Sequence, residues 1–257
     1  MHRCKLCDEE RELQKSHVIP RFIYKYMLGI TNNNLTQFDG QKNLWQKSNR
    51  QLKKELFCSE CEQLLGKNET TFSLIFKEIN SNSNREGLVC GELGSQAIKD
   101  IELKGITKQQ ISTFLENNLL YSQLSNLEYF AISYIYREIL NNSYNIPEKE
   151  ITKLRRFLLK QDDLAFMLHI RLHDSTPSFN LFSTAIVLDG LEDWKHYVFY
   201  LPNMQFHVAL RVGGTPEHMA KTLIIPSNFF NDELSSIELL RKFQKGSRVA
   251  SNLKHNK

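Results

Sequence analysis

The feature that most constrains how this chain can fold is a pair of Cys-x-x-Cys motifs. Cys4 and Cys7 form the first motif, and Cys58 and Cys61 form the second. A two-residue gap lets one tight turn offer two sulfur atoms to one metal ion, and four thiolates match the tetrahedral coordination of Zn²⁺. A redox role for one pair is the weaker alternative, since neither lies in a thioredoxin-like βαβ pattern. The sequence therefore predicts a structural zinc site.

The composition and the N-terminal residues indicate where such a protein works. Hydrophobic residues make up 41% of the chain and charged residues 24%, which is typical of a soluble globular protein. The N-terminal sequence lacks the apolar segment of a signal peptide, and no apolar run has the length of a membrane helix. Reduced thiols that bind metal are also typical of the cytosol. We expect a cytoplasmic protein with no membrane association.

Basic residues are concentrated in two acid-free stretches, although the formal net charge is only +4. The first stretch, residues 42–54, includes the candidate nucleic-acid-binding residues Lys47, Arg50, Lys53 and Lys54. The last 17 residues hold six Lys or Arg side chains. Such blocks suit contacts with phosphate groups. Solvated loops and a disordered tail are the alternative interpretation, and it stays open for the tail in particular.

Hydrophobic periodicity predicts the secondary structure of the N-terminal part. Residues 13–19 have the pattern of a short strand. The Asp-Gly pair within residues 35–45, between two alternating segments, predicts a β-hairpin. A helix is expected after Cys61, because apolar residues follow at helical spacing: Leu64, Leu65, Phe72, Ile75, Phe76 and Ile79.

The rest of the chain reads as helices followed by strands. Helical periodicity covers residues 107–142, a second helix opens near Pro147, and strand-like segments occupy 164–226. This order predicts an α+β fold in which helices pack on a small antiparallel sheet. We expect three parts: a zinc-bound domain over residues 1–83, an α+β domain over 84–245, and a basic, disordered tail over 246–257.

His17, Glu62 and Glu69 have the side chains that a metal-dependent nuclease requires. Such an enzyme needs a base that activates water and ligands that hold a divalent ion against the phosphate. His17 is a candidate for the base. Glu62 follows the last cysteine, and Glu69 lies two helical turns further on, so both are candidate ligands on one helix face. A backbone-bonded histidine and two solvated glutamates are the alternative interpretation.

The residues up to Thr71 resemble the zinc-bearing branch of the HNH endonucleases, whose fold is a ββα-metal treble clef. The resemblance rests on the two cysteine pairs, on the segment Ser-His-Val-Ile-Pro that ends at Pro20, and on the segment Leu-Phe-Cys-Ser-Glu-Cys-Glu that ends at Glu62. It implies that His17 is the general base and that the cysteines bind structural zinc. The family usually has Asp before the base, where this chain has Ser16. It usually has Asn or His after the last cysteine, where this chain has Glu62.

Two further features of the sequence bear on function. Asn43 and Asn49 lie where the family motif has its middle Asn. The segment His-Ile-Arg-Leu-His-Asp, residues 169–174, places two histidines at a helical metal-site spacing but lacks the glutamate of the H-E-x-x-H motif. The same segment also reads as a strand whose polar face carries His169, Arg171 and His173.

Two functions are therefore expected. The first is a metal-dependent endonuclease that uses Mg²⁺ or Mn²⁺, cleaves DNA rather than RNA, and acts in prokaryotic anti-phage defence. The second is a non-catalytic zinc module that binds nucleic acid or a partner protein. The C-terminal domain is the expected site of a protein partner or of a second copy of the chain. No nucleophile motif supports a hydrolase centred on the C-terminal sheet.

Overall fold

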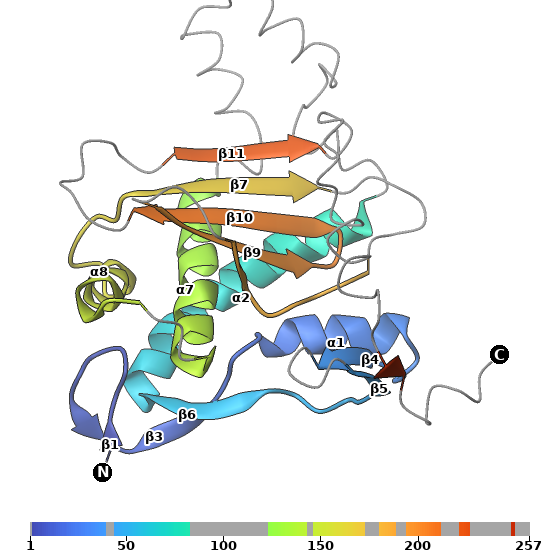
Figure 1. Cartoon of the computed structure of the whole chain (residues 1–257), viewed down its shortest axis with the longest axis horizontal. Coiled ribbons are helices and arrows are strands. Elements are labelled where there is room, and N and C mark those ends of the chain that lie inside the picture. Colours follow the sequence, from blue (N-terminus) through green and yellow to red (C-terminus); the bar gives the residue numbers. More distant parts are fainter. Residues whose placement is uncertain are drawn as a thin grey trace, which may run out of the picture. The chain divides into compact units, whose positions relative to one another are not determined.

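The computed structural model describes residues 2–39, 44–82, 123–142, 146–172, 180–188, 194–211, 221–226 and 248–249. It confirms the predicted mixture of helices and sheets (Figure 1). The chain divides into two compact units, one of residues 1–18 with 53–229 and the other of residues 19–52 with 230–257. The boundary expected near residue 83 lies outside the described residues.

Two small antiparallel strand pairs open the first unit. β1 (His2–Arg3) pairs with β2 (Glu10–Arg11), and β3 (Leu13–His17) pairs with β6 (Lys53–Cys58). The register of the second pair shifts between Gln14 and Lys15, so Leu56 has no partner on β3. The Leu56 carbonyl accepts a hydrogen bond of 2.9 Å from the Lys5 N–H instead. This β-bulge therefore ties the Cys4–Cys7 turn to β6.

Helix α2 (Ser59–Ser81) follows β6 directly and confirms the predicted helix after the second cysteine pair. Its first turn carries Glu60 and Glu62, where negative charge is favoured by the helix dipole. Most of the predicted apolar stripe is buried: Leu65, Phe72, Ile75, Phe76 and Ile79, whereas Leu64 is only half-buried. The stripe therefore turns one side of α2 toward the interior.

Two more helices of this unit lie among the described residues. α7 (Leu124–Asn142) lies within the predicted helical segment 107–142, and the earlier part of that segment is outside the described residues. α8 (Glu148–Leu158) begins after Pro147, as predicted. α7 is buried on nearly all sides. Even so, no described helix is long and apolar enough to cross a membrane.

A five-stranded sheet forms the other layer of this unit, in the order β11-β7-β10-β9-β8. Its strands are β7 (Phe166–Leu172), β8 (Ile186–Leu188), β9 (Trp194–Leu201), β10 (Met204–Arg211) and β11 (Lys221–Pro226). The neighbouring pairs are antiparallel, as expected, except that β11 adds a parallel edge beside β7. Segment 169–174 therefore belongs to a strand as far as Leu172, so its helical alternative is wrong.

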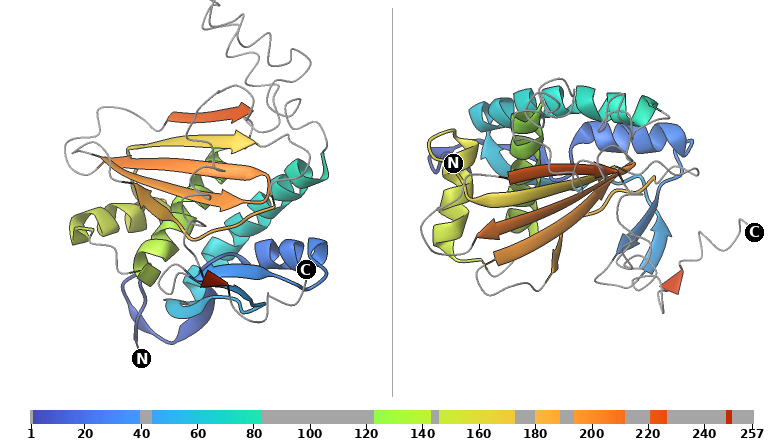
Figure 2. Two further views of the ribbon diagram at one scale, coloured as in Figure 1. Left: turned by 45° about the vertical axis from the view of Figure 1, so that its right-hand side comes forward. Right: turned by 90° about the horizontal axis from the view of Figure 1, so that it is seen from above.

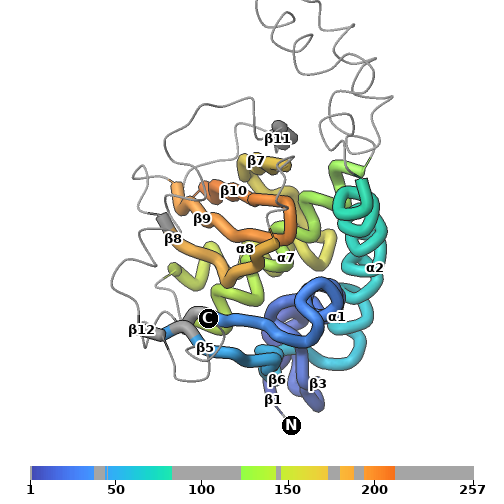
Figure 3. Tube along the Cα trace, turned by 90° about the vertical axis from the view of Figure 1, so that its right-hand side faces the viewer, coloured from blue at the N-terminus to red at the C-terminus, as the bar shows by residue number. Residues whose placement is uncertain are grey.

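Aromatic side chains join the sheet to the helices. The Phe72 ring of α2 stacks on the Phe130 ring of α7 with centroids 3.5 Å apart, and the Phe206 ring of β10 lies 6.2 Å from each. Figure 2 shows α2 and α7 on one face of the sheet, and Figure 3 shows the same two layers along the Cα trace. The buried aromatic layer explains why β10 alternates between buried and partly exposed residues beyond Phe206.

In its described residues, the second unit has one helix and a three-stranded sheet in the order β12-β5-β4. Its elements are α1 (Arg21–Ile30), β4 (Thr36–Asp39), β5 (Leu44–Lys47) and β12 (Arg248–Val249). β4 and β5 form the predicted antiparallel hairpin. β12 is the only part of the predicted tail among the described residues, and it pairs in parallel with β5. The sequence pattern did not predict α1.

Candidate metal centre and its surroundings

The four predicted cysteine ligands lie together although the two pairs are far apart in the sequence. Their sulfur atoms all lie within 4.8 Å of one another. Cys4 and Cys7 come from the turn between β1 and β2, whereas Cys58 ends β6 and Cys61 lies in the first turn of α2. The Cys7 and Cys58 sulfur atoms are 3.8 Å apart, and no disulfide joins the four side chains. This cluster is arranged closely enough to bind one metal ion.

Burial and backbone N–H groups act on the pKa values of these thiols in opposite directions. Burial would raise the pKa of Cys4, but the backbone N–H groups of Cys7, Cys58 and Leu6 lower it to about 7. Burial raises the pKa of Cys58 to about 11, and burial also raises the pKa of Cys61. A positive ion bound by the four sulfur atoms would favour their thiolate forms.

Several contacts hold the Cys4–Cys7 turn in place. Its own backbone closes the turn, because the Asp8 N–H donates to the Cys4 carbonyl at 3.0 Å while Asp8 adopts a φ of 69°. The Asp8 carboxylate pairs with Arg3 at 2.8 Å and with Arg155 of α8 at 3.1 Å. The Tyr136 hydroxyl of α7 donates to the Lys5 carbonyl. The turn is thus attached to both α7 and α8.

Glu62 contacts β3 through Ser16, the residue before the predicted base His17. The Ser16 hydroxyl donates to Glu62 Oε1 at 2.5 Å, and Ser16 is almost fully buried. His17 is the last residue of β3, half-buried, and pairs in register with Lys53. Neighbouring residues of a strand point to opposite faces. It is therefore Ser16 whose side chain the structure places against the first turn of α2.

Glu69, the second carboxylate predicted as a metal ligand, has a different neighbour. Its carboxylate pairs with the guanidinium of Arg137 on α7, and the Arg137 side chain is only 3% exposed. The Arg137 guanidinium also lies 5.9 Å from the centre of the Phe57 ring. Glu62 and Glu69, which were predicted to share a face of α2, contact different elements: Glu62 meets β3 whereas Glu69 meets α7.

The four predicted basic residues divide between the two units. Lys53 and Lys54 are exposed on β6, and Lys54 lies opposite Ser16 and donates to the Asn141 carbonyl at 2.9 Å. Lys47 ends β5, and Arg50 is exposed shortly after it. The structure therefore brings Lys53 and Lys54 beside the Ser16–Glu62 contact. Lys47 and Arg50 belong to the second unit.

Asn49, a candidate for the middle Asn of the family motif, has local contacts in the second unit. Its side-chain oxygen accepts from the Leu35 N–H at 3.2 Å, and its amide nitrogen donates to the Asn33 carbonyl at 2.7 Å. These bonds fix the approach to the β4–β5 hairpin. Asn43 lies outside the described residues.

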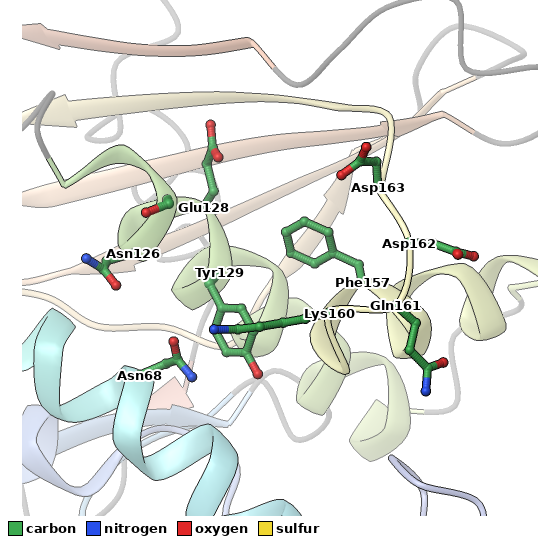
Figure 4. Close-up of a pocket in the computed structure, with 10 residues that line it drawn as sticks. Asn68, Asn126, Glu128, Tyr129, Phe157, Lys160, Gln161, Asp162 and Asp163 are labelled. Carbon is green, nitrogen blue, oxygen red and sulfur yellow. The ribbon is translucent and has the colours of Figure 1, made fainter.

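A separate pocket of about 400 Å³ lies where α2, α7 and the end of α8 meet. Figure 4 shows the Lys160 side chain across the Tyr129 ring, on the side where Asn68 of α2 lies. The ionisable lining residues are Lys160, Glu128, Asp162 and Asp163. The Asp162 carboxylate is already paired with Arg156. With one cation and three carboxylates, this pocket does not favour a phosphate group.

Comparison of the chain with protein-family models, with curated proteins and with solved structures gave no match. Any functional assignment therefore depends on the residues and contacts described above. The contact between Ser16 and Glu62 was not predicted from the sequence. The sequence does carry a signal for this contact. Ser16 stands where the family has an acid before the base, and Glu62 stands where the family has Asn or His after the last cysteine.

Proposed function

We propose that this protein is a metal-dependent endonuclease of the HNH type. The supporting observation is the 2.5 Å hydrogen bond between Ser16 and Glu62. In the family that the N-terminal sequence resembles, metal ligands occupy the position before the base and the position after the last cysteine. Those are the positions of Ser16 and Glu62. Two positions separated by 45 intervening residues are thus adjacent in space, as a shared metal site would require.

The four cysteines would hold a structural Zn²⁺ in a treble clef. With Zn–S bonds of about 2.3 Å, tetrahedral geometry sets sulfur atoms about 3.8 Å apart. The Cys7 and Cys58 sulfur atoms have that separation. The order of a cysteine turn, paired strands and a helix that begins at the second cysteine pair also suits this fold. Zinc here would join the β1–β2 turn to the end of β6 and to the first turn of α2, and it would take no part in the reaction.

Glu62 would hold a catalytic Mg²⁺ or Mn²⁺ ion. Mg²⁺ is usually bound by one or two carboxylates, several waters and the phosphates of the substrate. Glu62 supplies one carboxylate, and Ser16 replaces the family's acid with a small side chain that positions that carboxylate. An Asp at position 16 would place a second negative charge against Glu62. Glu69 remains a candidate ligand, and its ion pair with Arg137 would have to open for that role.

His17 would act as the general base. It directly follows Ser16, and in the family motif the acid and the base are likewise consecutive residues. It is the last residue of β3, opposite Lys53, and its side chain would have to turn toward an ion at Glu62, because the neighbouring Ser16 is the residue that faces α2. An imidazole there would take a proton from water as the water attacks the phosphorus atom. The bound divalent ion would stabilise the negative charge on the leaving oxygen.

Lys53 and Lys54 would position the nucleic acid. Both are exposed on β6 beside the Ser16–Glu62 contact, and cations at this place neutralise backbone phosphates. We propose DNA as the substrate. The acidic pocket in Figure 4 has no part in this proposal.

Plasmid nicking by purified, zinc-loaded protein in Mg²⁺ or Mn²⁺ tests the proposal. His17→Ala should lower the cleavage rate by about 10²–10⁴-fold, since general-base catalysis contributes that much. Glu62→Gln should also lower the rate, because it removes the carboxylate that would hold the divalent ion. Glu60→Gln is the matched control, because Glu60 lies in the same helical turn but pairs with exposed Arg11. All variants should keep the zinc content of the wild type.

Two outcomes would contradict the nuclease. Equal cleavage by the wild type and His17→Ala would assign the activity to another site or to a contaminant. No cleavage of plasmid, single-stranded DNA or RNA, together with salt-dependent DNA binding that weakens in Lys53→Ala/Lys54→Ala, would support a non-catalytic binding module instead.

A further inference from the structure

Three histidines gather on the face of the five-stranded sheet that is turned away from α2 and α7. Phe206 of β10 packs on the helix side, so His207 next to it points to the opposite face. His207 lies directly opposite His169 of β7 and opposite Val198 of β9. His196 is two residues before Val198 and therefore shares that face. The histidines thus come from three adjacent strands, and the proposed nuclease residues lie elsewhere.

Two of these side chains face one another at a specific distance. His207 Nδ1 and His196 Nε2 are 3.3 Å apart, with ring centroids at 5.3 Å and an interplanar angle of 40°. Two nitrogen ligands at about 2.0–2.1 Å from a tetrahedral ion are about 3.3–3.4 Å apart. The observed separation therefore suits two ligands of one ion. A single N–H···N hydrogen bond is the other state that this distance permits.

We propose that His196 and His207 bind a divalent transition-metal ion, with His169 as the third ligand. In the described part of the chain, the cysteines are the only group of three or more potential metal ligands whose ligand atoms all lie within 4.8 Å of one another. His169 therefore completes the site by turning its exposed side chain toward the pair. Imidazole ligands select Zn²⁺, Ni²⁺ or Cu²⁺, whereas Mg²⁺ requires oxygen ligands. This ion would differ from the one at Glu62.

Neutral imidazole, with a lone pair available on a ring nitrogen, is the form of histidine that binds metal. Arg171, two residues after His169, and Arg211, four residues after His207, are cations of this strand face that would oppose a bound ion. An ion held by β9 and β10 would fasten these two antiparallel strands to each other.

Equilibrium dialysis against Ni²⁺, followed by elemental analysis, tests the inference. The probe is Ni²⁺, and the protein is the full chain without a histidine tag and with its cysteine site filled with Zn²⁺. We expect one Ni²⁺ per chain in addition to the Zn²⁺. Loss of an outer-shell partner already lowers metal affinity by about 10–100-fold, so His196→Gln or His207→Gln should lower Ni²⁺ affinity at least as much.

Three further variants make the result specific. His169→Gln changes an exposed side chain and should weaken Ni²⁺ binding without altering the circular dichroism spectrum, so it keeps the test valid if a buried variant misfolds. His2→Gln, on β1, and Cys58→Ser are the controls for histidine number and for the cysteine site. Absorption spectra of the Co²⁺-loaded protein separate the two sites, because Co²⁺ bound to imidazole lacks the thiolate charge-transfer bands of Co²⁺ bound to cysteine. No Ni²⁺ beyond the Zn²⁺, or equal Ni²⁺ binding by the wild type and the three sheet variants, would show a hydrogen-bonded pair only and overturn the inference.

Discussion

Two regions of the first unit are stabilised in different ways. The cysteine region, made of β1, β2, β3, β6 and the first turn of α2, has strands of two to six residues and a core built around four thiols. The region of α7, α8 and the five-stranded sheet has a continuous layer of buried aromatic rings that includes Tyr134, Phe199 and Phe206. One region has few apolar side chains to bury, whereas the other has many.

The comparison teaches where the free energy of folding comes from in each region. Small strand pairs bury too little apolar surface for independent stability, so they need cross-links such as a bound metal. The sheet region buries large rings on one face against two helices, which is sufficient without a metal. We therefore expect metal loss to unfold the cysteine region first and to leave the sheet region folded.

Cys58→Ser should have the largest effect. Binding of structural zinc contributes about 10–16 kcal/mol in zinc-finger peptides, and this free energy is coupled to folding. Hydrogen exchange followed by mass spectrometry should show fast exchange in β3, β6 and the Cys4–Cys7 turn, while β9 and β10 keep their protection. Ser59→Ala, an exposed change one residue further on, is the control. Unchanged protection in β3 and β6 would break the comparison.

Phe206→Ala tests the other region. The Phe206 side chain is fully buried, and its ring lies 4.6 Å from that of Phe199. Truncation of a buried Phe costs about 3–5 kcal/mol because it removes apolar contacts and leaves a cavity. Denaturant unfolding should show this loss, whereas the metal content under native conditions should not change. Phe157→Ala, at a half-buried ring, should cost less. Loss of bound zinc in Phe206→Ala would mean that the two regions fold as one.

Glu138→Gln sharpens the comparison with a smaller, pH-dependent effect. Glu138 is fully buried in α7, and its Oε1 atom has no hydrogen-bond partner. Burial raises its pKa from 4.5 to about 7, although Asn142 and the Ala185 N–H donate to it. The unfolded carboxyl ionises near 4.5 and the folded one near 7, so stability falls as pH rises between these values. The full penalty is about 3 kcal/mol above pH 7.

The glutamine variant lacks this titration. Its free energy of unfolding should therefore match that of the wild type near pH 4.5 and exceed it by up to about 3 kcal/mol at pH 8. Chemical denaturation at a series of pH values measures the difference. Glu148→Gln, at an exposed position of α8, should show no such trend. A constant difference across the series would mean that Glu138 is already ionised in the folded protein.

Local patterns in the sequence predicted the elements that depend on local interactions. The Asp-Gly turn predicted the hairpin β4–β5, and the stripe from Leu65 to Ile79 predicted α2. The cysteine cluster was also predictable, because its ligand spacing has a chemical cause. α1 was missed, although Ile23, Tyr24 and Met27 have helical spacing and are buried. α1 lies between the Ser-His-Val-Ile-Pro segment and the Asp-Gly hairpin. Its N-cap position is Pro20, whose side chain makes no capping hydrogen bond, so the usual signal for the start of a helix is absent.

Pairings between distant segments could not be predicted. The parallel position of β11 beside β7 and the facing of His196 and His207 depend on strand order and register, which no local periodicity encodes. The ion pair between Glu69 and Arg137 depends in the same way on how α7 packs on α2. The Ser16–Glu62 bond needed the register of β3 with β6, including the bulge at Leu56.

The pairing of β3 with β6 has a consequence for how this chain can change in length. Residues 19–52 leave the first unit at one end of this strand pair and return to it at the same end. Doubling the length of such a connection costs only about 0.6 kcal/mol in chain entropy. A longer or shorter segment here should therefore leave the strand register, the thiol cluster and the serine–glutamate bond intact, provided that β5 keeps its pairing with β12.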